Sequence, residues 1–132
     1  MDIANQPEKK IKIMLVDDDD FLVDMYSAKF ANSGVDIIPV SSGTMLLEKL
    51  KKGEVADLIL LDIVLPQMDG IETLEKMREE KLGEGIPVVM LTNQNDENDV
   101  ARTNKLGISG YIVKATATPS EVVESVLKVL KK

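Results

Sequence analysis

The chain contains no histidine, cysteine or tryptophan among its 132 residues, and aromatic residues make up only 3% of it. Without cysteine there are no disulfides and no thiolate metal ligands. Without histidine as well, the chain cannot assemble a Ser-His-Asp triad, a Cys-His pair or a His-ligated zinc centre, and it cannot itself carry phosphohistidine. Any chemistry must therefore rely on carboxylates, hydroxyls, lysine and a hard cation.

Positive charge is also scarce, because 16 Lys and Arg stand against 23 Asp and Glu, a net charge of −7. This balance disfavours direct contact with nucleic acid, since neutralising phosphates requires a basic face. No apolar run approaches the ~20 residues of a membrane span, and residues 1–10 contain no hydrophobic signal core. We therefore expect a cytoplasmic protein with no membrane partner. Its length and 44% hydrophobic content predict one domain, residues 1–132, with a core over about 10–130.

Short apolar runs alternate along the chain with longer segments of helical period. The runs predict β-strands over residues 11–16, 35–40, 57–62, 87–91 and 109–113. The third and fourth are apolar on both faces, as in central strands covered by helices on each side. The fifth, which contains Gly110 and Tyr111, is typical of an edge strand.

Helices are expected between the strands, and four polar residues predict where they begin. Asp69 and Thr118 each stand three residues before a glutamate, the capping-box pattern, while Ser42 and Asp96 are the other candidate caps. Segment 97–106 has only a thin apolar face, so we expect it to pack loosely. Helical spacing predicts two buried faces, Phe21, Leu22, Met25 and Ala28 on the first helix and Val122, Val123, Val126, Leu127 and Leu130 on the last.

Five β-α units predict an α/β fold of the flavodoxin-like, doubly wound (βα)5 type, with helices on both faces of a parallel five-stranded sheet of order 2-1-3-4-5. In that order the winding reverses between the first and third strands, and ligands bind at the carboxyl ends there. Those ends carry Asp17, Asp18 and Asp62. At ~5 Å and an effective dielectric of ~20, each like-charge pair costs roughly 3 kcal/mol, so such a cluster predicts a metal site.

The segments LVDD (15–18), LDIVLPQMDG (61–70), LT (91–92) and YIVK (111–114) resemble the motifs of two-component response-regulator receiver domains of the CheY-like superfamily. The resemblance runs from Lys10 to Leu130 and is to the single-domain form of these proteins. It implies a phosphorelay protein that is not a turnover enzyme and that catalyses only its own phosphotransfer and autodephosphorylation. Because the chain ends one helix after the fifth strand, we expect a partner to deliver the output.

The resemblance implies a role for each acid. Asp62 would accept a phosphoryl group from the phosphohistidine of a sensor histidine kinase or a histidine phosphotransfer protein, and become phosphoaspartate. Asp18 and Asp62 would bind Mg²⁺ (or Mn²⁺), Asp17 would help through water, and the backbone carbonyl of Val64 would be a further ligand. Carboxylate, carbonyl and water oxygens are the ligands that suit these hard cations.

The resemblance also implies how the signal leaves the site. Lys114 would neutralise the phosphoryl oxygens and Thr92 would hydrogen-bond one of them. Tyr111, at the switch-aromatic position, would then rotate into the space that Thr92 vacates. A downstream protein would read the change on the fourth helix, fifth strand and fifth helix, with the chain a monomer or a phosphorylation-dependent dimer.

The chain departs from the family pattern at two positions. Ala115 follows Lys114 where the family has a cis proline, and we expect the Lys114–Ala115 bond to be cis nonetheless, because the aim of the lysine depends on it. Asn93 stands where a small residue is usual. Val64 and Gln94 occupy the positions that tune hydrolysis of the phosphoaspartate, and apolar Val64 is expected to give a longer-lived phosphoryl group.

Three other functions compete with this interpretation. A docking module would keep the pocket and signal without phosphorylation, which the unusual Ala115 and Asn93 leave open. A phosphatase of the haloacid dehalogenase type needs a second acid where Val64 stands. A flavodoxin-like FMN binder needs a phosphate loop rich in Gly, Ser and Thr, whereas the acids at 17–20 would repel phosphate.

Overall fold

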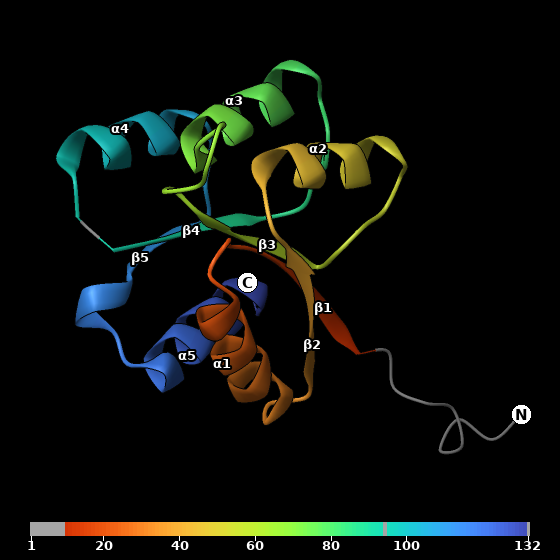
Figure 1. Ribbon diagram of the computed structural model, residues 1–132. Coiled ribbons are helices and arrows are strands. Elements are labelled where there is room, and N and C mark those ends of the chain that lie inside the picture. Colours follow the sequence, from red (N-terminus) through yellow and green to blue (C-terminus); the bar gives the residue numbers. More distant parts are fainter. Residues whose placement is uncertain (1–9, 94, 132) are drawn as a thin grey trace, which may run out of the picture.

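The computed structural model describes residues 10–93 and 95–131 (Figure 1). Within them, one five-stranded parallel sheet has the order β2-β1-β3-β4-β5, which confirms the predicted flavodoxin-like fold. Figure 1 shows α2, α3 and α4 over one face of the sheet and α1 and α5 over the other. The strands are β1 (Ile11–Val16), β2 (Val35–Val40), β3 (Leu58–Asp62), β4 (Val88–Thr92) and β5 (Gly110–Val113), and the helices are α1 (Asp20–Ala31), α2 (Gly43–Lys51), α3 (Gly70–Glu79), α4 (Glu97–Lys105) and α5 (Pro119–Leu130), with a 3₁₀ turn, η2 (Lys114–Thr116), after β5.

The strand register brings the predicted site together. β1 pairs with β3, Val16 opposite Leu61, so the acids that follow β1 lie beside the acid that ends β3. On its other side Asp62 pairs with Leu91, which places Thr92 at the same edge. β1 and β2 have the predicted bounds, and the other three strands differ from prediction by one residue at one or both ends.

Aliphatic side chains fill the core on both faces of the sheet, as the low aromatic content required. Alternate residues of β1 and β3 point to opposite layers, because successive side chains of a strand face opposite ways. The layer under α2 and α3 includes Met14, Ile59, Leu61, Leu46 and Leu74. The layer under α1 and α5 includes Ile13, Leu15, Leu58, Phe30 and Val126.

The predicted helix caps are all present. Asp69 and Thr118 each form a complete capping box with the glutamate three residues later. Ser42 caps α2 by accepting a hydrogen bond from the backbone of Met45, and Asp96 caps α4. These caps fix the starts of four helices, each of which follows the carboxyl end of a strand of the parallel sheet.

The predicted buried face of α1 is wrong at Phe21 and Ala28, whereas Leu22 and Met25 do pack against the core layer under α1 and α5. Phe21 is 77% exposed and Ala28 is exposed, while Leu22 and Met25 are only partly buried. Asp19 caps the helix, so Phe21 falls in its first turn and points outward. The helix has a second stripe of the same period, and this stripe faces the core: Val23, Tyr26 and Phe30.

Helix α4 packs as loosely as the sequence predicts. Only Thr103 is buried on it. Polar links connect its end to α3, since Arg78 Nε donates to the carbonyl of Leu106 at 2.7 Å and Arg102 lies 3.6 Å from Glu75. No helix in the described part of the chain is long and apolar enough to cross a membrane.

Candidate phosphoryl-acceptor and metal site

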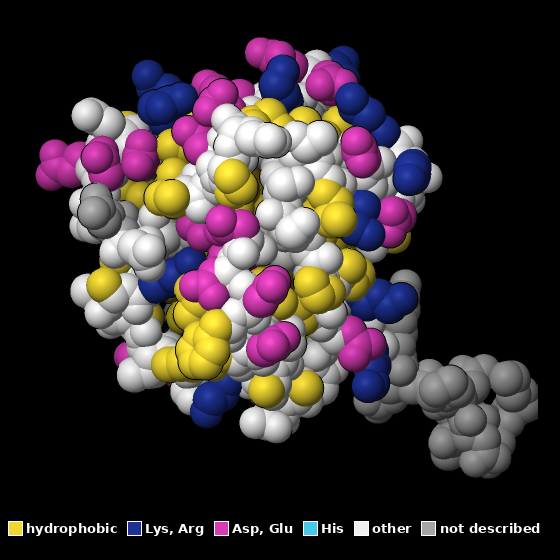
Figure 2. All heavy atoms as spheres, viewed as in Figure 1, with side chains coloured by type: hydrophobic (Ala, Val, Ile, Leu, Met, Phe, Trp, Pro, Cys, Tyr) yellow, Lys and Arg dark blue, Asp and Glu magenta, His cyan; other side chains and the backbone are white. Residues whose placement is uncertain are grey.

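Three carboxylates meet at the carboxyl edge of the sheet. Asp17, Asp18 and Asp62 each offer one ligand oxygen, and these oxygens lie within 4.8 Å of one another. Asp17 and Asp62 are buried and Asp18 is exposed. In Figure 2 several carboxylates lie near the centre of the face shown, with hydrophobic side chains beside them. The adjacency of the first and third strands therefore produces the predicted acidic cluster.

Lys114, which is 97 residues from Asp17 in the sequence, also contacts this cluster. Its Nζ lies 3.0 Å from Asp17 Oδ2 and 3.2 Å from Asp62 Oδ2, and its side chain is 7% exposed. The ammonium of Lys114 therefore bridges Asp17 and Asp62, two buried carboxylates that would otherwise repel each other.

The expected cis bond after Lys114 is a wrong prediction. The Lys114–Ala115 bond is trans, as are all peptide bonds of the described residues. The 3₁₀ turn η2 begins at Lys114 directly after β5 and directs the side chain into the pocket. The aim of the lysine therefore does not require a cis bond.

Backbone groups hold the two buried carboxylates in place. Asp17 Oδ1 accepts a hydrogen bond from the N–H of Asp19 at 2.9 Å, and Asp62 Oδ1 accepts one from the N–H of Val64 at 3.2 Å. Since Lys114 binds the other oxygen of each, both carboxylates have a fixed direction.

The electrostatics of the pocket disfavour an ionised Asp62. Burial raises its pKa above 3.8, and the charge of Asp17 adds to this, while Lys114 and the N–H of Val64 act in the opposite direction. For Lys114, burial lowers the pKa, but the charges of Asp62 and Asp17 and the hydrogen bonds to them outweigh it and raise the pKa above 10.5. A further cation would stabilise the ionised Asp62.

Thr92 is buried and lines a cavity of about 190 Å³ with Ile63, Val64, Asn93 and Asp99. The cavity thus adjoins the residue that follows Asp62. Asp99 was not among the predicted site residues, because an acid in the first turn of a helix is an ordinary feature of a sequence. The feature that could have identified Asp99 is its position, two residues after the start of a helix that begins beside this pocket.

Tyr111 lies on β5 and packs partly buried against the core layer under α2 and α3. Burial raises the pKa of its hydroxyl, as do the charges of Asp99 and, to a smaller degree, Asp96, whereas a backbone hydrogen bond with Asp96 lowers it. Tyr111 therefore connects β5 to the start of α4. Gln94, the other position expected to tune hydrolysis, lies outside the described residues.

The donor set fits a hard divalent cation. The ligand atoms that Asp17, Asp18 and Asp62 offer are all carboxylate oxygens, which suit Mg²⁺ and Mn²⁺. The exposure of Asp18 leaves a side open to water, and Mg²⁺ usually retains several water ligands in proteins.

Comparison with known proteins identifies the family. The sequence pattern of the response regulator receiver domain matches residues 13–127. The chain belongs to this family. Receiver domains are signalling proteins of two-component systems rather than turnover enzymes, they use Mg²⁺ at an acidic site, and response regulators partner with sensor histidine kinases.

Individual relatives agree with this assignment. The chain is 36% identical over 121 residues to the alkaline phosphatase synthesis transcriptional regulatory protein PhoP of Bacillus subtilis, with 92% of this chain and 49% of the relative covered. It is 35% identical over 115 residues to the DNA-binding response regulator MtrA of Mycolicibacterium paratuberculosis, with 87% of this chain and 49% of the relative covered. The chain thus spans about half the length of these curated relatives.

Solved structures agree as well. A response regulator receiver domain protein (CheY-like) from Methanospirillum hungatei superimposes with a TM-score of 0.83 at 26% identity, covering 93% of this chain and 95% of the other. A putative response regulator from Chloroflexus aurantiacus gives 0.82 at 27% identity, with coverages of 94% and 100%.

Proposed function

We propose that Asp62 accepts a phosphoryl group from the phosphohistidine of a sensor kinase or a histidine phosphotransfer protein, in a reaction that depends on Mg²⁺. The observation that carries the proposal is the contact of Lys114 Nζ with both Asp17 and Asp62, at 3.0 and 3.2 Å. It supports a pocket in which a fixed carboxylate nucleophile lies beside a fixed positive charge.

The chemistry needs little more than positioning and electrostatics. An ionised carboxylate is already a nucleophile, so an oxygen of Asp62 attacks phosphorus and forms a P–O bond while the P–N bond to the donor imidazole breaks. The imidazole leaves as a neutral ring when its other nitrogen carries a proton. The ammonium of Lys114 balances charge on the phosphoryl oxygens, and the hydroxyl of Thr92 donates a hydrogen bond to one of them.

The chain's own oxygens would hold the metal. Asp17, Asp18, Asp62 and the backbone carbonyl of Val64 would bind Mg²⁺ or Mn²⁺, with Asp17 acting through water. When bound, the cation supplies positive charge that offsets the developing charge on the phosphoryl oxygens.

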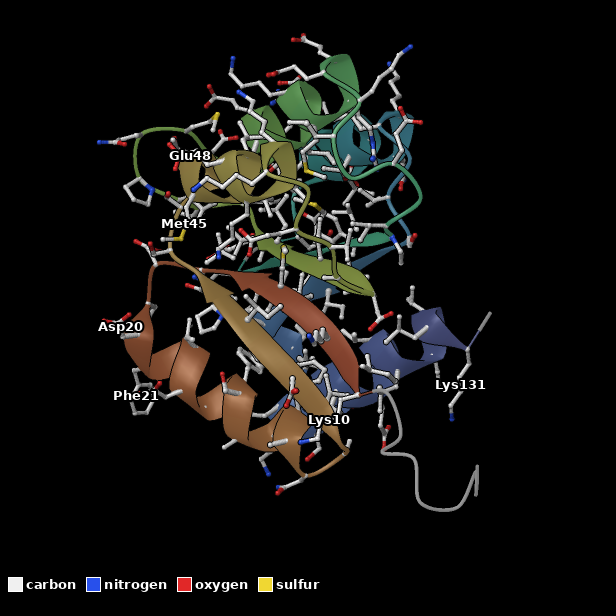
Figure 3. The ribbon with its side chains drawn as sticks, turned by 90° about the vertical axis from the view of Figure 1, so that its right-hand side faces the viewer. Lys10, Asp20, Phe21, Met45, Glu48 and Lys131 are labelled. Atoms are coloured by element: carbon white, nitrogen blue, oxygen red, sulfur yellow. The ribbon has the colours of Figure 1, made fainter. Side chains whose placement is uncertain are left out.

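Exposed apolar side chains near the acids support a protein as the phosphodonor. Phe21 is 77% exposed, Val64 67% and Met45 38%. Figure 3 shows Met45 and Phe21 along the same edge of the molecule as Asp20. An apolar rim beside a charged pocket is typical of a surface that binds another protein. A sensor kinase that acts on this pocket would place the reaction in the cytoplasm.

We further infer that α4, β5 and α5 carry the output, in a monomer or a phosphorylation-dependent dimer. Two observations support this. α4 buries only Thr103, so it is free of a large core contact that would resist movement. Tyr111 joins β5 to the start of α4, and Asp99 of α4 lines the same cavity as Thr92, so a movement of α4 around this cavity would change the contacts of Tyr111.

Intact-mass spectrometry tests the acceptor. The protein is incubated with Mg²⁺ and a small phosphodonor, and then with a phosphorylated histidine phosphotransfer protein. We expect a mass gain of one phosphoryl group in the wild type and in Asp36→Ala, a control at an exposed carboxylate, and no gain in Asp62→Ala. No gain in the wild type, or the same gain in Asp62→Ala, would favour the docking module instead.

A further inference from the structure

Gly70, the first residue of α3, lies directly against the backbone of the proposed acceptor. A Cβ atom at Gly70 would overlap the carbonyl oxygen of Asp62 and would lie 2.9 Å from both Asp62 C and Ile63 Cα. The N–H of Gly70 also donates to the carbonyl of Ile63 at 2.7 Å. The start of α3 therefore lies in direct backbone contact with the end of β3, with no side chain of residue 70 between them.

The backbone of Asp62 has little room to yield to a side chain there. β3 is a central strand, paired through Leu61 with β1 and through Asp62 with β4. The start of α3 is held just as firmly, because Asp69 forms a capping box with Glu72. A clash at Gly70 would therefore displace the loop of residues 63–69, which lies between two fixed elements.

That loop carries the groups that direct the acceptor. The N–H of Val64 donates to Asp62 Oδ1, and the carbonyl of Val64 is a proposed metal ligand. The loop also includes Gln67, whose φ of 68° lies in the left-handed region that a glycine would adopt more easily. The conformation of this loop is constrained at both ends and in the middle. A displacement at Gly70 would therefore change the direction in which the Asp62 carboxylate points.

We propose that Gly70 is a positioning residue for phosphorylation of Asp62. Its missing side chain lets α3 begin close enough to β3 to fix the Asp62 carboxylate toward Lys114 and to hold the Val64 carbonyl toward the metal. The inference rests on the proposed function of Asp62. A misplacement of about 1 Å in such a site costs on the order of 10²-fold in rate.

Gly70→Ala tests the proposal, with Gly43→Ala as a matched control. Gly43 is also the buried first residue of a helix, but its Cβ would overlap the hydroxyl of Thr73 and lie 3.2 Å from Cε of Met68, the movable end of a flexible side chain, and would not meet the backbone of Asp62. Each variant is measured for the rate of phosphorylation by a small phosphodonor, for Mg²⁺ affinity by calorimetry without phosphodonor, and for stability in urea.

We expect Gly70→Ala to slow phosphorylation on the order of 10²-fold and to weaken Mg²⁺ binding. Gly43→Ala should lose stability while its phosphorylation rate and Mg²⁺ affinity stay near those of the wild type. Equal losses of rate in the two variants, or a rate and Mg²⁺ affinity in Gly70→Ala close to wild type, would overturn the proposal. If the wild type takes up no phosphate, the Mg²⁺ affinities still decide the role of Gly70, and the proposed function fails separately.

A second pair of variants covers the case in which Gly70→Ala does not fold. Asp69→Ala removes the capping box of α3, and Thr118→Ala removes that of α5, which begins away from β3. The loss of either cap has a similar effect on helix stability. We expect only Asp69→Ala to weaken Mg²⁺ binding and slow phosphorylation, because only α3 fixes the loop of residues 63–69. Equal behaviour of the two variants would contradict a positioning role.

Discussion

Replacing Lys114 by methionine tests how far the two buried carboxylates depend on one positive charge. The change keeps an unbranched side chain but removes the ammonium that lies 3.0 Å from Asp17 Oδ2 and 3.2 Å from Asp62 Oδ2. Removing one partner of a buried ion pair costs about 3–5 kcal/mol, because the remaining charge has neither water nor a counter-ion. We expect a loss of that size in the free energy of unfolding around neutral pH without divalent cations.

The loss should depend on pH in a direction that the pKa of Asp62 fixes. The pKa of Asp62 is 3.8 in the unfolded chain and is higher in the folded protein. At a pH between the unfolded-state pKa and the folded-state pKa, the folded protein binds more protons than the unfolded protein, so stability falls as pH rises through that window. Without Lys114 the pKa of Asp62 rises further and the window extends to higher pH. The difference between Lys114→Met and wild type should therefore shrink on acidification toward about pH 4.

Urea unfolding between about pH 4 and pH 8, with and without Mg²⁺, measures this. Mg²⁺ at a hundred times its dissociation constant stabilises the folded state by about 2.7 kcal/mol, so it should recover part of the loss. Lys10→Met is the control, because Lys10 is exposed and its 3.6 Å contact with Asp36 lies at the surface. A loss in Lys114→Met no larger than in this control, or one unchanged between the two pH limits, would refute the reasoning.

Two further predictions concern the lifetime of the phosphoryl group and the attachment of α4. Val64→Asn should lose phosphate faster than wild type, since an amide orders attacking water better than the exposed valine does, and a slower loss in a phosphate-release time course would contradict this. Arg78→Ala removes the hydrogen bond to the carbonyl of Leu106, a charge-assisted contact of about 1.5–3 kcal/mol, and should raise amide hydrogen exchange in α4 but not in α1. Unchanged exchange in α4 would show that this contact does not hold the helix.

Much of the fold follows from patterns that a sequence expresses locally. The bounds of β1 and β2 follow from short, mainly apolar runs that each contain one charged residue, and the starts of α3 and α5 follow from capping boxes, since each of these signals depends on a few neighbouring residues. The face of α1 was predicted wrongly in part, because two stripes of the same helical period compete, and only tertiary packing decides between them.

The features of the site likewise divide into those that the sequence predicts correctly and those that it does not. The meeting of Asp17, Asp18 and Asp62 follows from strand order, which alternating elements predict well. The trans bond after Lys114 also agrees with the local sequence, because a peptide bond before alanine is almost always trans, and the expectation of a cis bond came from the family's proline rather than from Ala115. The roles of Thr92 and Tyr111 in switching stay predictions.

The net charge of the pocket predicts an order in which its ligands bind. Three carboxylates and a single ammonium leave two negative charges in excess when all are ionised. Such a pocket attracts a divalent cation and repels a phosphate dianion, so the cation should arrive first and the phosphodonor second. The affinity of a donor analogue should then rise with Mg²⁺ concentration, and by reciprocity the analogue should tighten the binding of the metal.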